Sequence, residues 1–350
     1  MLSVEFPMNH QKLLSIFRRV LSSPTAPFHE YFVRTEIERL LQGCPAVKLS
    51  TDPFGNLIAR YRAGQATSDW VFGAHMDHPG FVRNPADGQW RFLGGVPARY
   101  LELGAARREF GNFAMWDLQD FAVEDGRLVC RACDDLAGCA ILVCMLLELQ
   151  RREALGGVDV VFTRAEEVGF LGAIELGRAW PFDPDAVFVS VETSAAVGGV
   201  RMGSGPVVRA GDAVSFFDHE ASVLFMEISR GEGIPVQRAL LDRGSCEATA
   251  LQHYGIRSAG LSLLLGNYHN CSPEGEIAAE YVDLGDAKSL VNLLVSLVGS
   301  GRTETDSWRF QEQKFEERRL SYAAFCESSG DLLPCNRDGA DGRTARSKKV

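Results

Sequence analysis

Near the start of the chain, apolar residues recur at the spacing of a helix. Short runs of consecutive apolar residues follow. Apolar positions recur every three to four residues over 9–21 and 28–42, and the segment Pro24–Pro27 separates the two stretches. This period predicts two amphipathic helices. Strands are predicted for the short apolar runs at residues 47–49, 56–61 and 70–74. The last run is typical of a buried strand, and His75 and Asp77 follow directly at its end.

Residues 82–128 differ in character from the chain on either side. Paired residues typical of tight turns punctuate short β-like pieces, at Asp87-Gly88, Gly94-Gly95, Gly111-Asn112 and Asp125-Gly126. We therefore interpret this region as a small β-rich insertion into a larger domain.

Alternation of helix and strand resumes after the insertion. The pattern predicts helices at 136–149, 172–179, 245–253 and 284–298, and strands at 158–163, 186–191, 222–228 and 258–265. Such alternation favours an α/β fold with a mainly parallel central sheet flanked by helices. The main domain is then discontinuous, with residues 1–81 and 129–302 on either side of the insertion at 82–128. Residues 303–350 are expected to form a charged helix followed by a disordered polar tail.

Composition narrows the range of partners. The 350 residues are 46% hydrophobic and 23% charged, which are ordinary values for a globular enzyme. The net charge of −10 argues against nucleic acid, because binding it requires a concentrated basic face. We expect no membrane association, since no apolar run is long enough to span a bilayer and the N-terminus lacks the pattern of a signal peptide. Nine scattered cysteines, an odd number, favour reduced thiols in a cytoplasmic protein.

The candidate chemistry centres on the adjacent carboxylates Glu166 and Glu167. They follow the predicted buried strand at 158–163, and open α/β sheets bind ligands at the carboxyl ends of their strands. Neighbouring side chains on an extended segment point to opposite sides, so one carboxylate can bind a metal while the other faces a reacting water. An isolated Glu-Glu pair is also common on solvated loops, and the assignment therefore depends on the rest of the chain.

Four further stretches place imidazoles or carboxylates at predicted strand ends or just beyond them. They contribute His75 and Asp77, Asp134 and Asp135, Glu192, and His269. Nitrogen and oxygen ligands of this kind suit divalent zinc, cobalt or manganese. A two-metal hydrolase requires a bridging carboxylate, an imidazole and a further carboxylate on each metal, and a free carboxylate as base. The chain supplies each of these, although Asp134 and Asp135 alone would also be explained as helix-capping residues.

The order of these motifs resembles that of the dinuclear metallo-aminopeptidases, and most closely the glutamyl/deblocking aminopeptidases, or TET peptidases. The resemblance extends from about residue 10 to about residue 300. Its five ordered motifs are His75-x-Asp, Asp134-Asp-x-x-Gly, Glu166-Glu-Val-Gly, the strand-end acid Glu192, and Tyr268-His. Single motifs are weak signals, whereas the ordered set is specific. The fold that it implies is of the zinc-aminopeptidase type.

The resemblance also implies a role for each residue. Two divalent metal ions, zinc foremost and cobalt or manganese as alternatives, would be held by His75 with Glu192, by His269 with Glu167, and by a bridging Asp134. Glu166 would be the general base that deprotonates the metal-bridging water. Asp77 would accept the second N–H of the His75 imidazole. The Asp134–Asp135 bond would be a cis peptide, and the reaction would be hydrolysis of N-terminal peptide bonds of peptides.

Several departures from the family pattern bear on specificity and assembly. Leu136 stands where the family usually has Arg, Glu192 where many members have Asp, and Gly244-Ser-Cys-Glu-Ala where Gly-Thr-Asp-Ala is usual. The insertion is shorter than the family's dimerisation domain, so we expect a homo-oligomer, at least a dimer, rather than a large hollow assembly. We expect His78 to be a bystander, and we expect neither a zinc nor a redox site at Cys130-Arg-Ala-Cys133.

Two alternatives to the aminopeptidase remain open. One is a related metal-dependent hydrolase that cleaves an N-acyl amino acid or small amide. The departures at Glu192 and at residues 244–248 leave this alternative open. The other is a non-catalytic scaffold of the same fold, although every expected ligand and the base are present.

Overall fold

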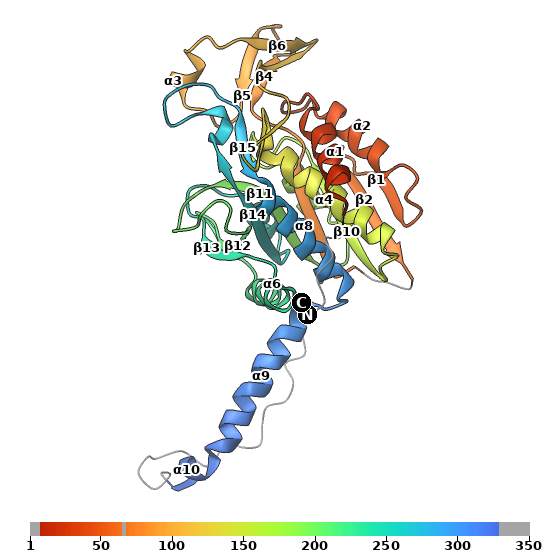
Figure 1. The fold of residues 1–350 in the computed structure, drawn as a ribbon, viewed down its shortest axis with the longest axis vertical. Coiled ribbons are helices and arrows are strands. Elements are labelled where there is room, and N and C mark those ends of the chain that lie inside the picture. The colour runs from red at the N-terminus through yellow and green to blue at the C-terminus, as the bar shows by residue number, and fades with distance from the viewer. Residues whose placement is uncertain (1–7, 65–67, 329–350) are drawn as a thin grey trace. The chain divides into compact units, whose positions relative to one another are not determined.

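The computed structural model describes residues 8–64 and 68–328 (Figure 1). The chain divides into two compact units, Met1–Glu304 and Thr305–Val350. The second unit contains most of helix α9 (Glu304–Ser321), where the sequence predicts a charged helix, and also α10 (Ala323–Ser328). The tail that we expect to be disordered falls from residue 329 onward outside the described residues.

The predicted α/β fold with a mainly parallel central sheet is confirmed (Figure 1). Within the described residues the sheet has 11 strands, and its centre is parallel, in the order β10 (Gly156–Thr163), β3 (Trp70–His75), β11 (Val187–Ala195) and β14 (Ser258–Gly266). Antiparallel strands extend both sides: β2 (Leu57–Ala63) and β1 (Val47–Thr51) beyond β10, and β15 (Glu280–Asp283), β9 (Arg127–Cys130) and β8 (Ala122–Glu124) beyond β14. A branch formed by β12 (Val207–Gly211) and β13 (Gln237–Leu240) also joins β14.

Successive residues of a strand point to opposite faces of the sheet, so strands with consecutive apolar residues make both faces apolar. In β11, Val189 and Val191 point into one core cluster, and Phe188 points into the other. The first cluster is completed by α1 (His10–Leu21), α2 (Tyr31–Leu41), α4 (Cys133–Arg151), α6 (His219–Glu232) and α8 (Leu284–Gly299). The second is completed by α5 (Leu171–Arg178) and α7 (Glu247–His253). Helix α4 is buried almost throughout, since it packs between the sheet and helices α1 and α8.

The insertion forms a separate four-stranded sheet in the order β5-β4-β7-β6. Its elements are β4 (Gly80–Arg83), β5 (Trp90–Leu93), α3 (Ala98–Leu101), β6 (Arg107–Phe110) and β7 (Phe113–Trp116). This sheet therefore ends at residue 116, whereas the glycine pattern suggested an insertion running to residue 128. The remaining strands, β8 and β9, belong to the large sheet because β9 pairs with β15.

The strand predicted at 222–228 is wrong, because this segment lies in helix α6. The buried residues Ala221, Leu224, Phe225 and Ile228 follow the spacing of one helical face. The side chain of Asp218 caps the start by accepting the N–H of Ala221, and Gly233 ends the helix in the left-handed conformation. Strands β12, β13 and β15 were not predicted, because each is only four or five residues long.

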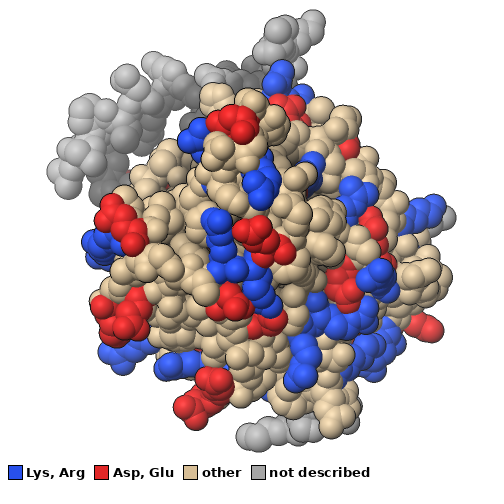
Figure 2. Space-filling model, turned by 90° about the horizontal axis from the view of Figure 1, so that it is seen from above, with Lys and Arg blue, Asp and Glu red and all other residues tan. Residues whose placement is uncertain are grey.

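Among the residues that the structure describes, no helix is both long enough and apolar enough to cross a membrane. Figure 2 shows basic and acidic side chains interspersed over much of the face that it presents, with several basic side chains gathered at its lower right.

Candidate metal centre

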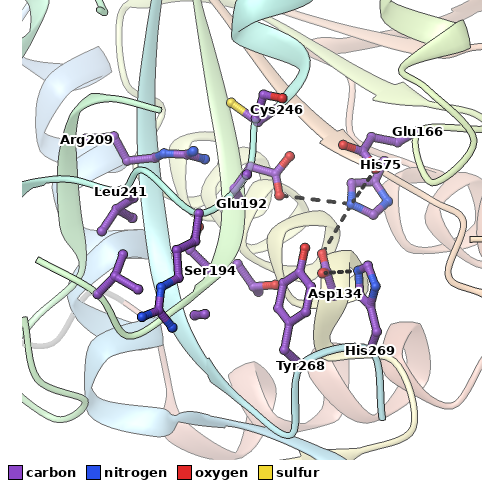
Figure 3. A pocket seen from close by; sticks show the side chains of 16 residues that line it. His75, Asp134, Glu166, Glu192, Ser194, Arg209, Leu241, Cys246, Tyr268 and His269 are labelled. Carbon is purple, nitrogen blue, oxygen red and sulfur yellow. Dashed lines mark ion pairs between the residues drawn. The ribbon is translucent and has the colours of Figure 1, made fainter. Parts of the chain in front are cut away.

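The predicted site residues lie together at the carboxyl ends of the central parallel strands. His75 ends β3, Glu192 lies in β11, and His269 follows β14 in the short 3-10 helix η1 (Tyr268–Asn270). Glu166 and Glu167 lie in the turn between β10 and α5, and Asp134 lies in the first turn of α4. The structure thus brings together all five predicted metal ligands and the predicted base, although they come from five separate segments. Figure 3 shows these residues except Glu167.

Asp134 lies between the two imidazoles. Its Oδ1 is 3.2 Å from Nε2 of His75, and its Oδ2 is 3.4 Å from Nε2 of His269. Each imidazole faces a further carboxylate, since Nε2 of His75 lies 4.0 Å from Glu192 Oε2 and Nε2 of His269 lies 3.4 Å from Glu167 Oε2. The result is two groups of three potential ligands that share Asp134, each spanning at most 4.8 Å. A further group combines His75 with Glu166 and Glu167.

Two buried oxygens in this cluster have no hydrogen-bond partner. They are Oε1 of Glu167 and Oδ1 of Asp134, which lies 3.2 Å from Nε2 of His75 without the geometry of a hydrogen bond. Buried carboxylate oxygens are normally satisfied by donors or cations. The two groups consist of imidazoles and carboxylates, which are ligands that divalent cations prefer. The unpaired oxygens could accept such cations, so the residues present fit a divalent metal site.

The carboxylates of the site are also buried close to one another, and their negative charges repel. Burial, reinforced by the charge of Asp134, raises the pKa of Glu167 well above its usual value. Burial likewise raises the pKa of Glu192 to about 7, against the opposing effect of His75. Glu247, which sequence reasoning missed, is fully buried at the start of α7, and burial raises its pKa to about 7 as well. Because the carboxylates outnumber the imidazoles, positive charge in this cluster would relieve their repulsion.

Asp77 holds the turn that carries the two glutamates. Its Oδ1 accepts the N–H of Glu166 at 3.0 Å, and its Oδ2 accepts the N–H of Glu167 at 3.1 Å. The resemblance implies that this carboxylate also accepts from Nδ1 of His75, and that nitrogen lies 3.1 Å from the carbonyl oxygen of Asp77 and 3.6 Å from Oδ1. The carboxylate is directed to the turn because it has two backbone donors there.

The backbone around the remaining ligands has special conformations. The peptide bond between Asp134 and Asp135 is cis, as the resemblance implied. Asn267, His269 and Asn270 all have left-handed φ values of +52° to +61°. Non-glycine residues adopt this conformation rarely, and they keep it where surrounding contacts hold them. One such contact joins Nδ1 of His269 to the carbonyl oxygen of Gly95 at 2.9 Å.

His78 is buried behind the cluster rather than in the pocket. Its Nδ1 lies 2.6 Å from the carbonyl oxygen of Asp134, and its Nε2 lies 3.0 Å from Oδ1 of Asn270. Burial, aided by the charge of Arg131, lowers its pKa to about 3. The enclosed ring therefore contacts the backbone of Asp134 from behind the site.

A pocket of about 250 Å³ opens beside the candidate ligands (Figure 3). Its lining also includes two arginines, Arg209 and Arg243, together with Leu241 and Cys246. Arg209 is only 3% exposed, its guanidinium carbon lies 5.5 Å from the ring centroid of Phe217, and its Nε has no hydrogen-bond partner. Sequence reasoning anticipated an altered pocket from residues 244–248 but did not identify these arginines.

An α/β sheet that gathers imidazoles and carboxylates at the ends of its parallel strands has the architecture of a metal-dependent hydrolase. Comparison with known proteins gives the family. Residues 100–293, more than half of the chain, match the model of the M42 glutamyl aminopeptidase family, and the chain belongs to this family. It is therefore a peptidase, a hydrolase acting on peptide bonds, and its family implies divalent metal ions.

Individual relatives are distant but cover most of the chain. A protein of Acetivibrio thermocellus described as "Putative aminopeptidase" is 27% identical over 344 residues, which covers 83% of this chain and 100% of the relative. The TET1 peptidase of Pyrococcus horikoshii has a similar fold, with a TM-score of 0.67 and 22% identity over 82% of this chain and 99% of that one. An aminopeptidase of Desulfurococcus kamchatkensis aligns with a TM-score of 0.69 and 19% identity, covering 84% and 96% of the two chains.

Proposed function

We propose that this chain is an aminopeptidase that uses two divalent cations, zinc foremost, to hydrolyse N-terminal peptide bonds. The observation that carries the proposal is the position of Asp134, whose two oxygens face one imidazole each. His75 and Glu192 would hold one cation, His269 and Glu167 would hold the other, and Asp134 would contact both. Cobalt or manganese would suit the same ligands.

Glu166 is the proposed general base. Its carboxylate lines the pocket, and Oε2 lies 3.9 Å from Nε2 of His75, whereas the neighbouring Glu167 faces His269. The cations would supply Lewis acidity at the scissile carbonyl and would lower the pKa of the attacking water. Glu166 would take the proton from that water and deliver it to the leaving amine. Asp77 would keep both glutamates in place by binding their backbone N–H groups.

The pocket arginines favour substrates with an acidic first residue. Arg209 and Arg243 line the same cavity as His75 and Glu166, and a side-chain carboxylate entering it would meet guanidinium groups suited to pair with it. A cavity of about 250 Å³ is large enough for one amino-acid side chain. The description of the matched family as glutamyl aminopeptidases agrees with this preference.

A substrate panel combined with a single conservative variant tests the proposal. Glutamyl, leucyl and lysyl anilides and N-acetylglutamate should be compared on protein loaded with zinc or cobalt, and glutamyl anilide should be hydrolysed fastest. Glu166→Gln should abolish turnover while leaving the metal content intact. Glu175→Gln, on the surface of α5, is the matched control and should keep full activity. Near-normal turnover by Glu166→Gln would reject the assignment of the base.

The same panel separates the alternatives. Faster cleavage of N-acetylglutamate than of every anilide would favour the amide hydrolase. Binding of less than one equivalent of metal after loading, with no turnover of any substrate, would favour the non-catalytic scaffold.

We also propose that the protein is a homo-oligomer, at least a dimer. The Pyrococcus horikoshii relative is described as assembling into a tetrahedron or a large octahedral shell. The insertion sheet here is confined to residues 80–116, which favours a smaller assembly. Light scattering at several protein concentrations would measure the mass, and a monomer at all of them would contradict this proposal.

A further inference from the structure

The two imidazoles of the proposed site take their outer hydrogen bonds from different parts of the chain. Nδ1 of His75 lies 3.1 Å from the carbonyl oxygen of Asp77, two residues further along. Nδ1 of His269 lies 2.9 Å from the carbonyl oxygen of Gly95, which is 174 residues away in the insertion. In both cases the contact at Nδ1 leaves Nε2 directed toward Asp134.

The loop that carries Gly95 is fixed at both ends. Gly94, before it, has a φ of +122°, and a Cβ atom there would lie 2.6 Å from Cβ of Pro79. Tyr100, after it, is buried in α3 and donates its hydroxyl hydrogen bond to the carbonyl oxygen of Ser272 at 2.7 Å. Ser272 is three residues beyond His269, so the insertion contacts the segment of His269 at two points.

These contacts matter because the backbone at His269 is itself left-handed. That conformation is uncommon for a side chain with a Cβ and is maintained by its surroundings. A histidine ligand also depends on the partner of its second ring nitrogen, which fixes the tautomer and the orientation of the ring.

We propose that the insertion positions His269 through the carbonyl of Gly95, so that one of the two cation sites depends on the insertion and the other does not. The inference rests on the proposed dinuclear site. Gly95 and Tyr100 act as positioning residues, because neither is among the ligand groups or the residues lining the pocket. Loss of such an outer partner typically lowers metal affinity about 10–100-fold.

Stepwise metal titration of the full chain tests the inference. Metal-free protein would be titrated with Co²⁺, following heat and the visible absorption of the bound ion. His269→Ala and His75→Ala identify the binding step that belongs to each imidazole. Gly94→Ala, which displaces the Gly95 loop, should weaken the His269 step about 10–100-fold and leave the His75 step unchanged.

Matched variants separate positioning from a general effect on folding. Gly111→Ala changes another left-handed glycine of the insertion, with nothing within 4 Å of the added Cβ, and should leave both steps unchanged. Tyr100→Phe should weaken the His269 step in the same direction as Gly94→Ala. Its control, Tyr61→Phe, removes a buried tyrosine hydroxyl that donates to carbonyl groups remote from the site, of Leu149 and Ala154. Thermal unfolding of each metal-free variant reports its folding.

The outcomes distinguish this inference from the proposed function. Two equivalents in the unmodified protein, with both steps unchanged in Gly94→Ala and Tyr100→Phe, would overturn the positioning role alone. Equal weakening of both steps would overturn it as well, because the effect would then be general. Fewer than two equivalents in the unmodified protein would refute the dinuclear proposal, and the inference with it.

Discussion

Replacing Asp77 with asparagine tests how the site holds its two glutamates. The carboxylate is fully buried, and its two oxygens accept one backbone N–H each, from Glu166 and Glu167. An asparagine side chain has one acceptor oxygen and one amide NH₂ group. One of the two backbone donors would therefore face another donor instead of an acceptor.

The size of the effect follows from the hydrogen bonds lost. A hydrogen bond to a charged group contributes about 1.5–3 kcal/mol to the stability of the fold. Asp77→Asn should lower the free energy of unfolding by about that amount, because one such bond is lost and the other becomes neutral. Since the displaced turn carries both the proposed base and a proposed ligand, kcat should fall about 10–100-fold.

Asp286 provides a control of the same geometry. Its carboxylate is 3% exposed and accepts the backbone N–H groups of Gly203 and Gly205, both at 2.7 Å. Asp286→Asn should destabilise the fold to a similar degree in urea denaturation, but it should leave kcat and the metal content unchanged. Equal kcat values for Asp77→Asn and Asp286→Asn would refute the claim that Asp77 positions the catalytic turn.

Three further predictions concern the metals and the core. Asp134→Ala should abolish binding of both cations, whereas Glu192→Ala should weaken the binding of only one. Metal analysis after gel filtration measures this. Loss of a single equivalent from Asp134→Ala would contradict the arrangement in which both cations share Asp134. Chelation with EDTA should stop hydrolysis, and zinc or cobalt should restore it in an activity assay. Leu142→Ala, at a fully buried position of α4, should lower the free energy of unfolding by about 2–5 kcal/mol in urea. Leu155→Ala, at a position that is 77% exposed, should change it by less than about 0.5 kcal/mol.

Much of the fold was predictable because its central strands are apolar and end in polar residues. The run Val158–Phe162 and the residues following it place Glu166 and Glu167 at a strand end without any knowledge of the fold. Segment 222–228 was predicted incorrectly because its apolar residues suit either a short strand or one face of a helix. Asp218 and Gly233, which cap that helix at its two ends, were the signals that distinguish these possibilities.

The outer contacts of the site were harder to predict for a physical reason. A ligand such as His269 is identified by its side chain, but the atom that orients it is a backbone carbonyl, and every residue has one. What makes the carbonyl of Gly95 special is its place in space, which depends on the left-handed turn at Gly94 and on the anchoring of Tyr100 to Ser272. The glycine pair at 94–95 indicates a turn but not what the turn reaches. Side-chain chemistry therefore predicts which residues can hold cations, whereas the geometry of a distant loop decides how firmly one of them is held.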